Sequence, residues 1–277
     1  LLVYTDLENF KYFNRKYGYA AGDQLLREFT GYIIDTLKKR NTAHFTMVVA
    51  DQFILFFEEK WNNGSIEAIK RINNGFIERQ QRKYPEAKLR LRTGVYKVEK
   101  DCDGASFAID AANYARRQIQ DNSPETVCVY DKTMADLQNM ENEIAIGLDK
   151  AIKNKEFKIY LQPRFSLTTG KIVGAESLVR WQREDGTILP PDSFIPVYEK
   201  NGRIIDLDFY MFEETVKLLA NWKEQGIPQR LISINASALH AQNSDTVHRY
   251  TTILEKYGVD PALIELELTE TATVSDY

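Results

Sequence analysis

The sequence predicts two α/β units in tandem, an α+β domain followed by a β/α domain of the barrel type. The first observation is length, because 277 residues suit two domains better than one. The second is a change of pattern: strands and helices alternate irregularly in the first half and regularly in the second. The third is composition, since 43% hydrophobic and 27% charged residues are ordinary for a globular protein.

Charge and cysteine content exclude several classes of protein. Lys and Arg total 36 against 40 Asp and Glu, so the net charge of -4 argues against binding a nucleic acid polymer. Cys102 and Cys128 are too few for a disulfide framework, which fits a reducing, cytoplasmic location. Because no apolar run approaches about 20 residues, we expect no membrane contact within this chain. The chain starts at Leu1 within strand-like sequence, so we expect a missing N-terminal region that could tether it to a membrane or sensor.

The first half reads as strands and amphipathic helices in the order β-α-β-β-α-β-α-β. The expected strands are 1–5, 44–49, 53–57, 89–98 and 127–130. The expected helices are 23–40, 65–83 and 105–118. This order predicts a mostly antiparallel sheet with helices packed on one side.

A polar helical stretch over 132–153 is expected to connect the two domains. Beyond it, we expect strands at 157–162, 172–181, 231–235 and 263–268. Helices are expected at 206–225 and 245–257. A closed β/α barrel needs about eight strands, so we expect the barrel to be incomplete in this chain, with its C-terminal part missing.

Motifs of the first half resemble those of a GGDEF (diguanylate cyclase) domain over residues 1–131, without that family's N-terminal start. They are Asp6-x-Glu8-x-Phe10-Lys11-x-x-Asn14, Gly18-x-x-x-Gly22-Asp23, the hairpin Val49-Ala50-Asp51-Gln52-Phe53, and Asp110-x-Ala112-x-Tyr114. The third of these stands where the family carries its signature.

The signature is degenerate in this chain. Val49 and Ala50 replace two glycines that let the backbone approach the GTP phosphates, and Val49 resists the backbone conformations that glycine allows. Gln52 replaces an acid and adds no negative charge to a metal site. The resemblance therefore implies that diguanylate cyclase activity is absent.

Other parts of the nucleotide site are retained. By resemblance, Asp6 and Asp51 match metal-ligand positions, and Asn14 and Asp23 match guanine-binding positions. GTP binding as a regulatory input is one hypothesis. The alternative is that Asn14 and Asp23 only cap a helix that begins near Asp23.

The second half places polar groups at strand ends. Strand alternation puts Glu176, Leu178 and Arg180 on one face. The next strands end in an amide and in carboxylates, Asn235 and then Glu265, Glu267 and Glu270. Such oxygen ligands suit Mg²⁺ or Mn²⁺, and an arginine can hold a phosphate through two bonds. The alternative is that these acids are solvated strand-end charges, one of which pairs with Arg180.

Five motifs in order, across about residues 144–277, are similar to those of an EAL domain, and we expect the domain itself to span 154–277. They are Gln162-Pro163, Glu176-x-Leu178-x-Arg180-Trp181, Pro191-x-x-Phe194-Ile195-Pro196, Ser233-x-Asn235 and Glu267-x-Thr269-Glu270. The signature tripeptide reads Glu-Ser-Leu. The resemblance implies a modified TIM barrel that hydrolyses cyclic di-GMP.

The resemblance also implies roles for individual residues. Catalytic metal ligands match Glu176, Asn235 and Glu267. Substrate contacts match Arg180, Leu178 and Gln162. The implied chemistry is two-metal hydrolysis to linear pGpG, and the family's remaining ligands would lie beyond Tyr277.

The favoured interpretation is therefore a cyclic di-GMP phosphodiesterase with a cyclase-inactive GGDEF-like regulatory domain. The alternatives are a receptor that binds cyclic di-GMP or GTP without turnover, and a scaffold that binds no nucleotide. A homodimer is expected by analogy with the family.

Overall fold

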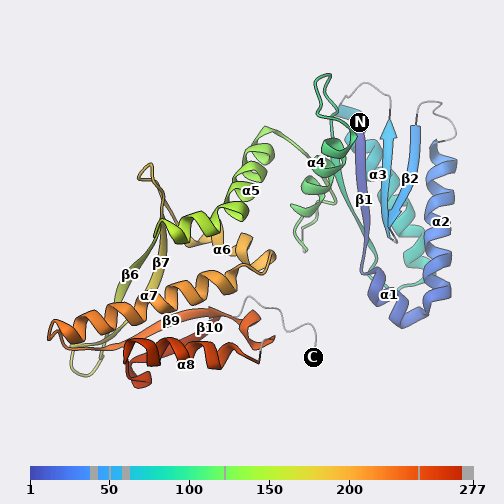
Figure 1. Ribbon diagram of the computed structural model, residues 1–277. Coiled ribbons are helices and arrows are strands. Elements are labelled where there is room, and N and C mark those ends of the chain that lie inside the picture. Colours follow the sequence, from blue (N-terminus) through green and yellow to red (C-terminus); the bar gives the residue numbers. More distant parts are fainter. Residues whose placement is uncertain (38–42, 50, 58–62, 122, 243, 270–277) are drawn as a thin grey trace. The chain divides into compact units, whose positions relative to one another are not determined.

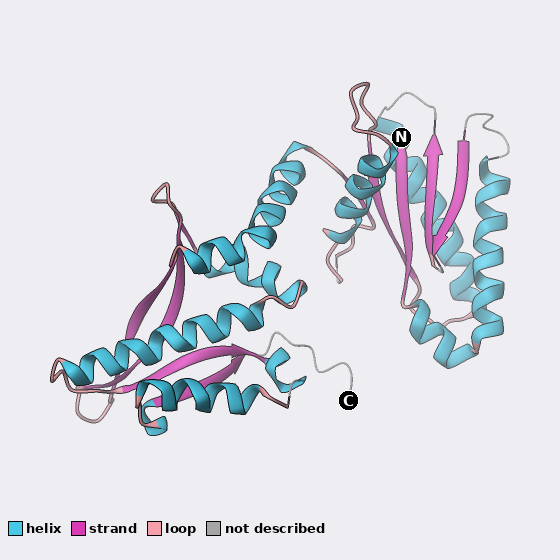
Figure 2. Cartoon of the chain, viewed as in Figure 1, coloured by secondary structure: helices cyan, strands magenta, loops and turns pink. Residues whose placement is uncertain are grey.

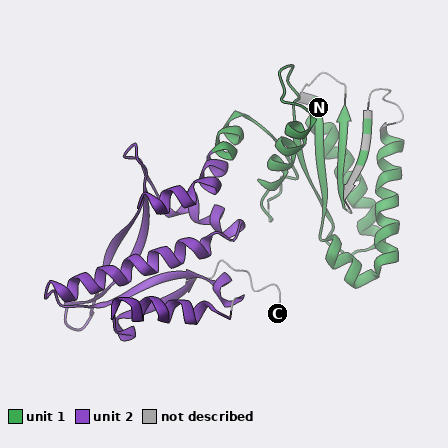
Figure 3. Cartoon of the chain, viewed as in Figure 1, with its two compact units in different colours: residues 1–139 green, residues 140–277 purple. Residues whose placement is uncertain are grey.

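The computed structural model describes residues 1–37, 43–49, 51–57, 63–121, 123–242 and 244–269. The chain divides into two compact units, Leu1–Asn139 and Met140–Tyr277, each with its own sheet (Figure 3). None of the helices that the structure describes is long and apolar enough to cross a membrane.

The first unit is built on a five-stranded sheet of order β2-β3-β1-β4-β5. The strands are β1 (Leu2–Glu8), β2 (Ala43–Val49), β3 (Gln52–Phe57), β4 (Arg90–Tyr96) and β5 (Val127–Val129). The central strand β1 runs antiparallel to β3 and β4, and only the β4–β5 pair is parallel. The predicted mostly antiparallel sheet is thus observed.

Helices cover both faces of this sheet, so the expectation that they lie on one side is wrong (Figure 1). The helices are α1 (Phe10–Tyr17), α2 (Tyr19–Leu37), α3 (Asn63–Lys83) and α4 (Ala105–Arg117). Val3 and Leu55 share a core with α1, α2 and α3, whereas Leu2 and Ile54 pack against the alanines of α4. Successive residues of a strand point to opposite faces, so each apolar strand serves two helix layers.

Helix α1 is an element that the sequence analysis did not predict, and α2 starts at Tyr19 rather than near Asp23. Gly18 separates the two helices with a φ of 87°, a conformation that favours glycine. Gly18 of the GGDEF-like motif therefore has a structural role at the junction between α1 and α2.

Helix α5 (Lys132–Lys153) has the bounds that the sequence predicted, and the division between the units falls within it. Its later residues Ile144 and Leu148 are fully buried in the core of the second unit. The hydroxyl of Tyr198 donates to the carbonyl of Ile144 at 3.0 Å. The end of α5 is thus a structural part of the second unit.

The second unit carries a mixed sheet of order β10-β9-β7-β6, with β8 paired to β7 (Figure 2). The strands are β6 (Phe157–Phe165), β7 (Ile172–Gln182), β8 (Ile188–Leu189), β9 (Leu231–Ser237) and β10 (Ile264–Thr269). The helices are α6 (Pro191–Lys200), α7 (Ile204–Glu224) and α8 (Thr246–Tyr257). The β6–β7 pair is antiparallel, and β7, β9 and β10 run parallel. Within the described ranges the sheet is open, with β6 and β10 at its edges.

Candidate functional site

Polar side chains line the face of the second sheet that is turned away from α7. Ser177 of β7 contacts Thr215 of α7 at 3.1 Å, so its neighbours Glu176 and Leu178 point to the opposite face. In the strand register, Glu176 lies between Gln162 of β6 and Ser233 of β9. Three strands, β6, β7 and β9, therefore contribute to one polar face.

Glu176 and Asn235 are joined by a hydrogen bond on this face. The amide nitrogen of Asn235 donates to Oε1 of Glu176 at 2.9 Å, and both residues are half-buried. Glu267 of β10 lies directly opposite Asn235 in the parallel register. Three predicted metal ligands from three strands thus lie on the same face, and the Asn235 amide oxygen is not used by this bond.

An arginine that the sequence analysis did not single out pairs with two acids of β10. Arg164 of β6 pairs with Glu265 at 2.8 Å and with Glu267 at 3.5 Å. The alternative that Arg180 pairs with Glu265 or Glu267 is therefore wrong. Arg180 donates instead to the carbonyl of Val179 at 2.7 Å. Arg164 lies two residues after Gln162 on β6, so strand alternation could have placed both side chains on the same face.

A second group that the sequence did not reveal holds the end of β9. Asp208 of α7 is buried, accepts the backbone N–H of Ser237 at 2.8 Å, and contacts Nε2 of His240 at 3.0 Å. His240 is therefore a buried histidine whose partner is Asp208. Since Ser237 follows Asn235 by two residues, Asp208 fixes the backbone that carries the amide ligand. The sequence signal that could have revealed this residue is an aspartate, Asp208, among the apolar residues of α7.

A pocket of about 410 Å³ opens beside this strand end. It is lined by Asp192, Ile195, Pro196, Glu199, Ile204, Asp208, Asn235, Ala236 and Ser237. Glu199, which follows the Phe-Ile-Pro motif, thus lies at the same hollow as the Asn235 amide. The pocket can admit a ligand group next to that amide.

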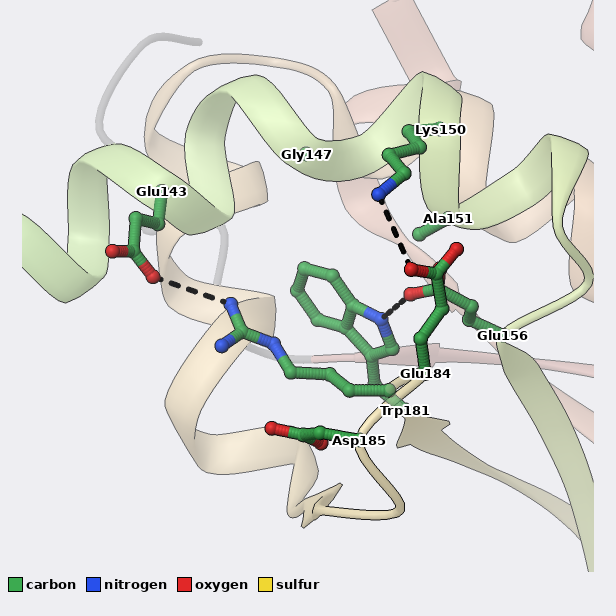
Figure 4. A pocket seen from close by; sticks show the side chains of 9 residues that line it. Glu143, Gly147, Lys150, Ala151, Glu156, Trp181, Glu184 and Asp185 are labelled. Atoms are coloured by element: carbon green, nitrogen blue, oxygen red, sulfur yellow. Dashed lines mark hydrogen bonds and ion pairs between the residues drawn. The ribbon is translucent and has the colours of Figure 1, made fainter.

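Another pocket, of about 290 Å³, lies between α5 and the β7–β8 turn (Figure 4). Its charged groups already have partners within the protein. Glu156 accepts the indole N–H of Trp181 at 2.8 Å, and Lys150 pairs with Glu184 at 3.5 Å. Arg183 pairs with Glu143 at 3.6 Å. We therefore regard this hollow as part of the packing of α5.

The oxygen donors on the β7–β9–β10 face suit a hard divalent ion such as Mg²⁺ or Mn²⁺. Among the residues that the structure describes, no three His, Cys, Asp or Glu side chains gather closely enough to hold a metal. The face offers two carboxylates and one amide, and the Glu176–Asn235 bond holds two of these groups in contact. The residues present therefore fit part of a metal site.

In the first unit, the predicted metal ligand Asp6 is partnered by a protein group. Asp6 accepts from Arg116 of α4 at 2.9 Å. Gln52 lies opposite Asp6 in the strand register and accepts the hydroxyl of Tyr4 at 2.7 Å. Asp51 stands in the turn before β3, where burial raises the pKa of its carboxyl. Ala50 lies outside the described residues, as does Glu270 of the second domain.

Asn14 and Asp23 occupy helix interiors, so the capping alternative is wrong. Asn14 lies in α1, and Asp23 is the exposed fifth residue of α2. The side-chain oxygen of Asn14 is buried without a hydrogen-bond partner. A Cβ atom at Gly22 would come within 1.8 Å of that oxygen, so this glycine lets α1 and α2 pack closely.

Two family models match the chain in succession. The model described as "Diguanylate cyclase, GGDEF domain" matches residues 1–124, and the one described as "EAL domain" matches residues 147–277. The chain therefore belongs to the proteins that carry a GGDEF and an EAL domain in tandem.

Curated proteins are similar to nearly the whole chain at low identity. Signaling protein YkoW of Bacillus subtilis is 27% identical over 279 residues, which cover 100% of this chain and 34% of YkoW. Cyclic di-GMP phosphodiesterase PdeR of Escherichia coli is 25% identical over 286 residues, which cover 99% of this chain and 41% of PdeR. The chain thus spans less than half the length of these relatives.

A solved structure has a similar fold over nearly the whole chain. It is the S helix-GGDEF-EAL structure of Vibrio cholerae LapD bound to c-di-GMP, with a TM-score of 0.53 and 18% identity. The match covers 99% of this chain and 64% of that one. At this identity the likeness shows the fold alone.

Proposed function

We propose that the chain hydrolyses cyclic di-GMP to linear pGpG on the face that carries Glu176, Asn235 and Glu267. The observation that carries this proposal is the Glu176–Asn235 hydrogen bond beside Glu267, because it brings oxygen donors of three strands together. The EAL family match and the name of the relative PdeR support the same activity.

The chain's own residues have distinct tasks in this proposal. Glu176, Glu267 and the amide oxygen of Asn235 would hold Mg²⁺ or Mn²⁺, which would supply a Lewis acid for the hydrolysis. Arg180 orients a phosphate through two N–H bonds, after giving up its bond to the Val179 carbonyl. The substrate contacts are completed by Leu178 and Gln162.

The test is chromatography of cyclic di-GMP incubated with natural-length protein and Mg²⁺ or Mn²⁺. The parent is expected to accumulate pGpG. Glu176→Ala is expected to do so at least about 100-fold more slowly, because loss of a metal ligand exceeds the 10–100-fold effect of outer-shell partners. Glu184→Ala, an exposed acid on the loop after β7, is the control and is expected to keep the parental rate. Intact cyclic di-GMP with the parent would contradict the proposal, and calorimetry would then distinguish a receptor from a scaffold.

We also propose that the GGDEF domain makes no cyclic di-GMP and acts as a regulatory module, with GTP as a candidate input. Support comes from Gln52, which is neutral and is already bonded to Tyr4. Incubation of the purified protein with GTP and Mg²⁺ is expected to yield no cyclic di-GMP. Formation of that product in a Glu176→Ala background would contradict this. Homodimerisation and a cytoplasmic location stay predictions.

A further inference from the structure

Arg116 of α4 reaches the acidic end of β1 in the first unit. Its Nη1 donates to Oδ2 of Asp6 at 2.9 Å, and its Nε donates to Oδ1 of Asn113 at 2.9 Å. The Arg116 and Asp6 side chains are only 13% and 20% exposed. The ion pair is therefore sheltered from water and held in one orientation.

Gly94 of β4 explains how α4 comes close enough for this contact. A Cβ atom at position 94 would lie 1.8 Å from the carbonyl oxygen of Ala112 and 2.5 Å from the backbone nitrogen of Arg116. The helix backbone thus rests directly on the strand beside β1. The approach places the Arg116 guanidinium over the end of β1.

The groups around Asp6 favour a positive charge next to its carboxylate. Burial raises the pKa of the Asp6 carboxyl, and the negative charge of Asp51 raises it further, while the Arg116 guanidinium lowers it. Burial raises the pKa of the Asp51 carboxyl as well, and the Arg116 guanidinium and Lys11 offset part of that rise. The ring of Tyr4 lies 5.6 Å from the guanidinium carbon, so a cation is favoured on that side as well. Arg92, another nearby cation, pairs with Glu8 instead.

We propose that the Arg116 guanidinium takes the place of a divalent cation at the acidic pair Asp6 and Asp51. The metal that the GGDEF resemblance implies does not fit these residues. Mg²⁺ prefers a near-octahedral shell of oxygen atoms, whereas Oδ2 of Asp6 already accepts an N–H bond from the Arg116 guanidinium, which is held in place by Asn113. A bound divalent ion would also stand beside a full positive charge. The first unit therefore completes this site with its own side chain.

The test counts Mn²⁺ ions bound per chain by equilibrium dialysis, for the parent and for Arg116→Ala. Arg116→Ala is expected to bind one more Mn²⁺ than the parent. Its affinity for this added ion is expected to be at least tenfold tighter than the affinity of the parent at the same site. Arg117→Ala is the matched control, because it removes the same charge from the next residue of α4, where the guanidinium lies over the ring of Tyr114. It is expected to bind Mn²⁺ as the parent does. The double variant Asp6→Asn/Arg116→Ala is expected to lose the added ion.

Two results would overturn the inference. One is loss of a bound Mn²⁺ when Asp6→Asn is made in the parent, because the site would then already hold metal. The other is no added ion in folded Arg116→Ala, with folding checked by circular dichroism. If Arg116→Ala does not fold, Arg116→Gln replaces it, since an amide can still donate to Asp6 without a charge. Sites of the EAL domain are common to all variants, so failure of the proposed phosphodiesterase would not alter this comparison.

Discussion

At the scale of single residues, Asp208 connects the core of the EAL domain to its polar face. Its carboxylate is 12% exposed and accepts from both Ser237 and His240. We expect Asp208→Ala to lower the free energy of unfolding by about 2–3 kcal/mol, because two buried donors lose their acceptor. Denaturant unfolding measures this loss.

The matched control for Asp208 lies on the same helix. Asp206 is 46% exposed and pairs with Arg203 at 2.7 Å. Exposed pairs contribute at most about 1 kcal/mol, so Asp206→Ala is expected to cost less than that. Equal losses for the two variants would show that Asp208 has no special part in anchoring β9.

At the scale of elements, Gly94 sets the distance between α4 and β4. Because a Cβ atom there would overlap helix backbone at 1.8 Å, we expect Gly94→Ala to destabilise the GGDEF domain by about 3 kcal/mol. Gly31→Ala in α2 is the control, since no atom lies within 4 Å of the added Cβ. Its expected effect is a gain of about 0.5–1 kcal/mol from helix propensity. Thermal or denaturant unfolding that shows no loss for Gly94→Ala would contradict the packing described for α4.

The contact between α2 and α3 gives a pH dependence with a definite sign. Burial tends to raise the pKa of Glu28, but hydrogen bonds from Lys83, Gln80 and Gln24 leave it below its ordinary value. A lowered carboxyl pKa means that the ionised form stabilises the fold above about pH 4.3, the unfolded value, and that this contribution fades as the pH falls through the folded pKa.

We therefore compare the unfolding free energies of the parent and Glu28→Gln at pH 7 and pH 3. The parent is expected to be more stable by up to about 1 kcal/mol at pH 7, because the 29%-exposed carboxylate pairs with Lys83. The difference is expected to shrink at pH 3. An equal difference at both pH values would assign the effect to packing rather than to charge.

At the scale of the whole molecule, periodicity predicted most of the elements but not α1 or α6, and packing decided where the elements lie. The bounds of α5 and the strand positions of Glu176 and Asn235 follow from local pattern. The layer to which α4 belongs does not, because its small apolar residues could meet either face of the sheet. The contacts of Arg116 and Arg164 span 110 and 101 residues, so local pattern could not reveal them either.

The central claim is that the face shared by β7, β9 and β10 is where the chain hydrolyses cyclic di-GMP. The most direct measurement is the rate of pGpG formation by Asn235→Ala relative to the parent, with Asn221→Ala of α7 as the control. Asn235 lies between Glu176 and Glu267 on that face, so we predict a fall of at least about 100-fold for a folded Asn235→Ala protein and no change for Asn221→Ala. Parental hydrolysis by Asn235→Ala would contradict the assignment of this face as the active site.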